Sequence, residues 1–140
     1  MAPEDFVDRF VAAWAQPMPQ GVLAAIRDLS HPDVEASQPM LPTVRGIEAY
    51  VRSFEDVFAL MPDFHPEVVT SAVTGDTVLI VSRVAATMGG RRVGFDVCDR
   101  FILREGLIYR RHAYFDPTPI VVGLLLRPWL LPKAVRSMRR

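Results

Sequence analysis

Apolar residues recur at helical spacing in the N-terminal part of the chain. Within residues 3–15, Phe6, Phe10, Ala13 and Trp14 return every three to four positions, which predicts an amphipathic helix. Similar repeats follow, interrupted by turn-forming prolines and glycines. The elements predicted for this part are helices over 3–15, 22–29 and 46–60, a short strand over 34–37, and a proline-punctuated loop over 38–46.

Beyond residue 64 the pattern changes to an alternation of apolar and polar positions, which is typical of strands. Gly75, Gly89 and Gly106 fall between the alternating runs and indicate hairpin turns. Pro117 ends the last run. The runs predict consecutive antiparallel strands over 67–73, 77–88, 91–103 and 107–116.

This order of elements predicts an α+β fold. Three N-terminal helices against one face of a curved, mostly antiparallel sheet would make a cone-shaped α+β barrel with an apolar interior, a natural site for a small ligand. We expect residues 1–117 to form this cone. The tail, 118–140, is expected to belong to the same domain, as short helices broken at Pro128 and Pro132 that act as a lid or a dimer element.

Composition narrows the class of protein. Hydrophobic residues make up 50% of the 140 positions, enough for a sizeable core and too many for a disordered chain. The one cysteine, Cys98, excludes an internal disulfide and fits a reducing compartment. The three histidines lack metal-ligand spacing, and phosphate-binding and dinucleotide motifs are absent from the sequence. We therefore predict no metal, cofactor or nucleic-acid partner, and, from an N-terminus without a signal-peptide core, a cytoplasmic location.

Charge is distributed unevenly along the chain. The formal net charge is zero, yet all 16 acidic residues precede Pro117, and residues 117–140 hold five cations and no acid. One interpretation is a solvated basic end, or one that docks on the acidic body. The other is contact with an acidic surface or lipid headgroups. The longest apolar run of the tail, "IVVGLLL", is too short to span a bilayer.

Titratable residues gather in the last predicted strand, at "RRHAYFD". Strand alternation places Arg110, His112, Tyr114 and Asp116 on one face. We interpret this as the face that points into the cone. Asp116 would then act as the catalytic base with His112 as its partner.

Two further charges stand among apolar residues in the neighbouring strands. Asp99 interrupts an aromatic and aliphatic row, and Arg83 lies in a similar row. A buried charge must be paired or neutralised. We predict that Asp99 and Arg83 converge with His112 and Asp116, where they would orient the substrate or stabilise an oxyanion.

Structural alternatives stand beside these roles. Asp99 and Arg83 would equally serve as a buried ion pair that fixes sheet register, and Asp116 as the cap of a turn. The predicted ligand-binding residues form the cavity wall and rim: Phe10, Trp14, Gln38, Met40, Tyr50, Phe54, Phe58 and Tyr114.

Four segments of the chain resemble the nuclear transport factor two-like superfamily, in its SnoaL-like branch of polyketide cyclases, ketosteroid isomerase and limonene epoxide hydrolase. They are "FVDRFVAAWA", "HPDVEASQPMLPTVRGIEAYVRSFEDVF", "DVCDRFILREGLI" and "RRHAYFD". With the element order they cover residues 5 to 116. The resemblance implies a cone-shaped fold whose chemistry sits on cavity-facing residues.

The resemblance to ketosteroid isomerase implies three catalytic positions. Phe10 stands where that enzyme has its oxyanion-binding tyrosine, and Gln38 where it has its general base. Asp99 matches the second oxyanion donor, or Cys98 does if the following turn has the family's length. Because two of the three positions have changed, we predict that the chain does not isomerise steroids by that mechanism.

The resemblance to limonene epoxide hydrolase and to the SnoaL-type cyclases implies different catalytic positions. The limonene epoxide hydrolase pair of arginine and aspartate reads Arg83-Val84-Ala85, so its aspartate is missing, and the last-strand aspartate aligns with Ala113, or with Asp116 if the strand bulges. In the SnoaL-type cyclases an aromatic residue precedes the catalytic aspartate by four positions. Here His112 and Asp116 take those places, which preserves the central acid.

Two classes of function remain. One is a cofactor-free acid–base enzyme, of isomerase, cyclase or epoxide-hydrolase type, acting on a small hydrophobic compound. The other is a non-catalytic module that binds a hydrophobic ligand or forms a dimer. Related domains often pair through the sheet, so the resemblance implies a homodimer, for which we expect the face with Val78, Ile80, Val84, Ala86 and Met88. The basic tail adds a weak membrane contact as a further possibility.

Overall fold

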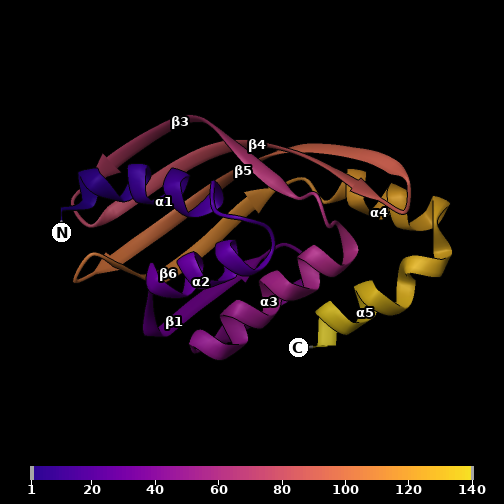
Figure 1. The fold of residues 1–140 in the computed structure, drawn as a ribbon, viewed down its shortest axis with the longest axis horizontal. Helices are drawn as coiled ribbons and strands as arrows, with labels where there is room; N and C mark the ends of the chain where they lie inside the picture. Colours follow the sequence, from indigo (N-terminus) through magenta and orange to yellow (C-terminus); the bar gives the residue numbers. More distant parts are fainter. Residues whose placement is uncertain (1, 140) are drawn as a thin grey trace.

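A curved sheet with helices packed against one of its faces dominates the computed structural model, which describes residues 2–139 (Figure 1). The elements, in chain order, are η1 (Pro3–Asp5), α1 (Phe6–Trp14), α2 (Gln20–Asp28), β1 (Ser30–Gln38), β2 (Leu41–Arg45), α3 (Ile47–Leu60), β3 (His65–Thr74), β4 (Thr77–Met88), β5 (Arg91–Arg104), β6 (Leu107–Phe115), α4 (Thr118–Leu126), η2 (Pro128–Leu130) and α5 (Leu131–Arg139).

The six strands lie in the order β2-β1-β6-β5-β4-β3. Every neighbouring pair is antiparallel except β1 and β6, which run parallel. The predicted α+β cone with a mostly antiparallel sheet is confirmed, although β2 and β3 remain as free edges and the sheet does not close into a barrel.

The predicted hairpin strands agree with β3 to β6 within two residues, but two expectations for the N-terminal part were wrong. Strand β1 begins at Ser30 rather than at residue 34, and β2 occupies part of the predicted loop. The sheet accommodates a proline in each of these strands. Pro42 lies in the edge strand β2, and Pro32 lies where the β1–β6 pairing is interrupted between Ser30 and Glu35.

The core forms where α1 and α3 pack on the inner face of the sheet. All four residues of the predicted α1 stripe are buried, and Phe6 and Phe101 meet at the centre with ring centroids 5.0 Å apart. Tyr50 of α3 is buried beside them in the same cluster. This packing fixes which sheet face becomes the interior.

The face expected to form a dimer is instead part of this interior. The residues named for it are all fully buried: Val78, Ile80, Val84, Ala86 and Met88. The two-residue turn at Gly89-Gly90 pairs Met88 with Arg91, and the same register places Ile80 opposite Asp99. The even-numbered side chains of β4 therefore point inward, and the expected dimer surface was wrong, while dimerisation itself stays a prediction.

The tail turns back over the open end of the cone (Figure 1). Helix α4 packs on β5, and α5 returns alongside α3 and β2. A Cβ on Gly123 of α4 would lie 2.2 Å from the Met88 methyl, so this helix approaches the sheet closely. Pro132, expected to break the tail, lies in the first turn of α5, where the missing N–H has no helical partner to lose.

Among residues 2–139, no single helix is long and apolar enough to cross a membrane. Two consecutive segments, Thr118–Leu126 and Pro128–Arg136, reach that length and apolarity only together, across a bend of 107°.

Candidate functional site

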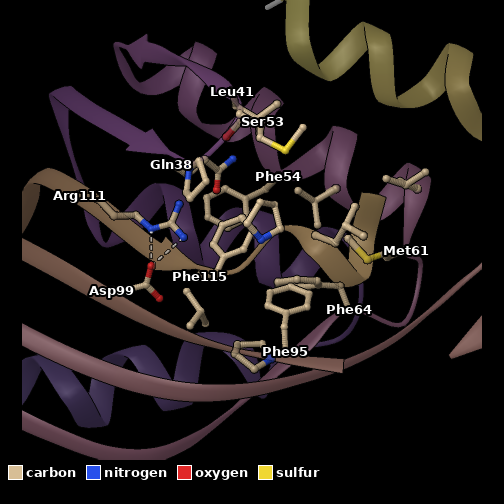
Figure 2. A pocket seen from close by; sticks show the side chains of 18 of the residues that line it. Gln38, Leu41, Ser53, Phe54, Met61, Phe64, Phe95, Asp99, Arg111 and Phe115 are labelled. Carbon is tan, nitrogen blue, oxygen red and sulfur yellow. Dashed lines mark hydrogen bonds and ion pairs between the residues drawn. The ribbon is translucent and has the colours of Figure 1, made fainter. Parts of the chain in front are cut away.

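A cavity of about 170 Å³ lies between the sheet, α1, α3 and the tail (Figure 2). A cavity of roughly 150 Å³ holds a benzene molecule, so this one suits a compact ligand. Its wall is mainly aromatic, formed by Phe10, Trp14, Phe54, Phe64, Phe95, Phe101 and Phe115. Among the residues predicted to bind a ligand, those that line it are Phe10, Trp14, Gln38, Met40, Tyr50 and Phe54.

A buried ion pair forms the polar end of this cavity. Arg111 of β6 donates from Nη2 to Oδ1 of Asp99 at 2.8 Å and from Nε to the same oxygen at 3.0 Å (Figure 2). Asp99, on β5, is only 4% exposed. Among residues 2–139, the other carboxylate oxygen, Oδ2, accepts no hydrogen bond. Asp99 is thus held by one oxygen and has the other left for a ligand.

Tyr50 and Phe54 bring helix α3 to the same end. Burial raises the pKa of Tyr50 to about 12, so its phenol stays protonated in neutral solution. Burial also opposes the charge of Arg111, but Asp99 and Tyr50 outweigh it and the pKa of the guanidinium is raised. The guanidinium lies 5.5 Å from the Phe54 ring centroid, a cation–π contact.

The phenol of Tyr50 is a hydrogen-bond donor at the same end of the cavity as Arg111. Tyr50, Arg111 and Asp99 all line the cavity, and the positive charge of Arg111 opposes the rise in the Tyr50 pKa that burial causes. A guanidinium carries donors only, and a protonated phenol can also donate. The polar end therefore combines a carboxylate oxygen with two kinds of donor.

Gln38 lies on the same side of the cavity as Arg111, at the end of β1 (Figure 2). Its amide can position a ligand oxygen or hydrogen, but it cannot take a proton at neutral pH. Ser53 of α3 also lines the cavity, and its hydroxyl donates to the Tyr50 carbonyl.

A bulge in β6 overturns the predicted inward face of the last strand. At the turn Leu103 pairs with Ile108, but the register shifts by one residue, and Asp99 then pairs with Ala113. Without the shift Asp99 would stand opposite His112. A one-residue slip exchanges the two faces of a strand, so Arg111 points inward where His112 was expected.

His112 and Tyr114 lie on the outer face of the sheet. The His112 ring packs against Tyr114, with centroids 4.3 Å apart, and its Nδ1 is hydrogen-bonded to the Ser37 hydroxyl of β1. Tyr114 is 48% exposed and does not line the cavity. The inward orientation predicted for both residues was wrong.

Arg83 and Asp116 are also outside the cavity. Arg83 pairs with Asp96 at 3.3 Å on the exposed outer face, because the β4–β5 register places odd-numbered β4 residues there. The exposed Asp116 carboxylate accepts a hydrogen bond from the Thr118 N–H at 2.9 Å, and its hydrogen bonds to Thr118 lower its pKa. Asp116 therefore caps a turn, and its predicted convergence with Asp99 was wrong.

Phe58 belongs to the core behind the cavity wall. Its ring meets Trp14 edge-on with centroids 5.9 Å apart, and it does not line the cavity. Among the predicted catalytic residues only Asp99 lies at the site, while its partner Arg111 was missed. The two-residue turn at Gly89-Gly90 sets the β4–β5 pairing, so the sequence could have placed Arg83 on the outer face. The bulge in β6 has no evident signal in the sequence.

The chain has the nuclear transport factor two-like fold. The model of the SnoaL-like domain family matches residues 7–111, and the chain therefore belongs to that family.

Solved structures agree with this assignment. A nuclear transport factor two-like protein from Burkholderia thailandensis E264 aligns with a TM-score of 0.77 at 20% identity, over 89% of this chain and 98% of that one. A candidate SnoaL-like polyketide cyclase from Jannaschia sp. CCS1 gives 0.75 at 18%, over 86% and 90%. IdmH, a candidate polyketide cyclase from Streptomyces antibioticus, gives 0.72 at 20%, over 89% and 99%. No curated protein matches the sequence.

Proposed function

We propose that this protein binds a compact, largely apolar carbonyl compound in the cavity and moves a proton on it by cofactor-free acid–base chemistry. The observation that carries the proposal is the polar end of an aromatic cavity, where Asp99, Arg111 and Tyr50 meet. A carboxylate beside hydrogen-bond donors at the end of an apolar cavity is the arrangement that enolisation requires.

Each group has a distinct part in the proposed reaction. Oδ2 of Asp99 takes a proton from the carbon next to the carbonyl, and the C–H electron pair forms an enolate. Tyr50 and Arg111 donate to the enolate oxygen. In an isomerisation Asp99 returns the proton to a different carbon. In a cyclisation the enolate carbon attacks a second carbonyl of the same molecule, and the resulting alkoxide takes up the proton.

Two of the similar structures are described as candidate polyketide cyclases, which supports cyclisation as the variant to test after proton abstraction itself. The expected base has changed from Asp116 to Asp99, because the Asp116 carboxylate is engaged by Thr118 outside the cavity. Removing a general base slows a reaction by typically 10²–10⁴-fold. Substitution of Asp99 is therefore the strongest test of the proposal.

The test uses acetophenone, a one-ring ketone with an enolisable methyl group, in D₂O. Proton NMR follows loss of the methyl signal as deuterium enters, so no product has to be guessed. We expect the protein to accelerate exchange and Asp99→Asn to lose most of this acceleration. Tyr50→Phe should retain part of it, and Arg83→Gln serves as a matched control on the outer face.

Three outcomes separate the alternatives. Exchange that depends on Asp99 supports the enzyme. Binding of acetophenone, seen as ligand line broadening, with exchange equal in wild type and Asp99→Asn would refute catalysis and leave the non-catalytic binding module. Neither binding nor exchange would refute the proposal that the cavity takes a compact aromatic ketone.

A further inference from the structure

The C-terminal tail exposes an unusual share of the apolar surface. Of the fourteen large hydrophobic residues exposed in the described chain, seven fall within residues 122–138. They are Val122, Leu125, Leu126, Trp129, Leu131, Val135 and Met138. Single exposed apolar residues are common, but a concentration of this kind marks a binding surface. Because Met138 also lines the cavity, we call the other six residues the tail surface.

Helix α4 is apolar on both of its sides. Ile120, Val121 and Leu124 line the cavity, while Leu125 and Leu126 point away from it and are exposed. A helix that is hydrophobic all round is normally covered all round, by protein or by lipid. The fold covers only the inner side of α4, so its outer side lacks a partner within residues 2–139.

Trp129 is the aromatic residue of the tail surface and is 65% exposed. The Arg127 guanidinium lies 5.6 Å from its ring centroid, and Arg127 also donates from Nε to the Gly89 carbonyl at 2.9 Å. A tryptophan beside a cation, on a segment anchored to the fold, is the combination found where proteins meet the headgroup region of a bilayer.

The positive charge of the tail indicates which kind of partner the tail surface binds. Residues 117–140 contain five cations, Arg127, Lys133, Arg136, Arg139 and Arg140, and no acidic residue. Two copies that met through this surface would bring ten cations together, which opposes a symmetric dimer there. A surface of anionic lipid would take up the apolar side chains and attract the cations at once.

We propose that the tail surface is a docking site for anionic membranes, on which the protein lies without crossing the bilayer. Docking would place lipid against the outer side of α4, the helix whose inner side lines the cavity. The proposal does not rest on the proposed function, since it concerns the outer side of the tail and needs no chemistry in the cavity.

Vesicle binding tests it with the full chain. Co-sedimentation with vesicles of phosphatidylglycerol and phosphatidylcholine is compared with pure phosphatidylcholine at two salt concentrations. We expect binding to the anionic vesicles alone, weakened by salt. The double variant Lys133→Gln/Arg136→Gln should bind about 25-fold more weakly, from roughly fivefold per charge.

The apolar contribution has its own variant and a matched control. Leu125→Ser/Trp129→Ser changes two strongly exposed side chains, so the fold should survive, yet binding should fall at least tenfold. Val69→Ser removes a similarly exposed apolar residue from β3 and should bind like wild type. Trp129 fluorescence should shift to the blue on vesicles, since the other tryptophan, Trp14, is already buried.

Three results would overturn the proposal. One is no binding to anionic vesicles, and another is binding that Leu125→Ser/Trp129→Ser leaves unchanged. The third is a dimer by light scattering that the same variant turns into a monomer, without vesicle binding. That result would assign the tail surface to a second copy of the chain.

Discussion

Arg111 and Asp99 are joined across two neighbouring strands by an ion pair of 2.8 Å that is largely removed from water. Neither strand carries another charged side chain into the cavity. The ion pair depends on the register of β5 and β6, because a one-residue slip would move Arg111 to the outer face.

Breaking this pair from one side should be costly. Arg111→Met leaves a buried carboxylate without compensation, and we expect the free energy of unfolding to fall by about 3–5 kcal/mol. The double variant Arg111→Met/Asp99→Asn should recover much of that loss. Urea unfolding measures both, and the exposed pair of Arg83 and Asp96 is the control, where Arg83→Gln should cost less than about 1 kcal/mol. Equal losses at the two pairs would contradict the buried role.

Tyr50 should make the protein sensitive to alkali. Its pKa is about 12 in the folded protein and about 10 in an unfolded chain, so the folded state holds the proton more tightly. This contribution to stability is complete below pH 10 and is lost as the pH rises towards 12. Between pH 9 and 11 we expect wild type to lose about 1 kcal/mol more than Tyr50→Phe in urea unfolding. An identical pH dependence in the two proteins would show that the Tyr50 phenol is not buried.

Asp116 should matter for the turn and not for proton transfer. We expect Asp116→Asn to exchange acetophenone deuterium at the wild-type rate. The pKa of Asp116 is lowered by its hydrogen bonds to Thr118, so its contribution to stability is present above the usual aspartate pKa and is lost as the pH falls. The variant should lack that acid-dependent part in thermal unfolding. A strongly slowed exchange would instead restore Asp116 as the base.

Gly123 allows α4 to sit close to the sheet. Gly123→Val places side-chain atoms against the buried Met88, so we expect a loss of about 1–3 kcal/mol in unfolding free energy and a displaced tail. Leu125→Val, in the same helix but 73% exposed, is the control and should stay within about 0.5 kcal/mol of wild type. If Gly123→Val proved as stable as wild type, the close approach of α4 would be incorrect.

Local sequence determined most of the elements. The Phe6-Phe10-Trp14 spacing produces the buried stripe of α1, and the glycine turns fix three hairpins, with β4 spanning the predicted residues 77–88. The same local signals were misleading at Pro32 and Pro42, because a proline is tolerated at a sheet edge or an interrupted pairing, and only the strand order shows where those are.

The sequence by itself determined that this chain forms an α+β cone with an aromatic interior and that Asp99 stands as a charge within it. The partner of Asp99 was decided by the tertiary structure alone. A single bulge in β6 exchanges the two faces of the strand, bringing Arg111 in and sending His112 out. Alternation along a strand says which residues share a face, but the pairing of strands decides which face is buried.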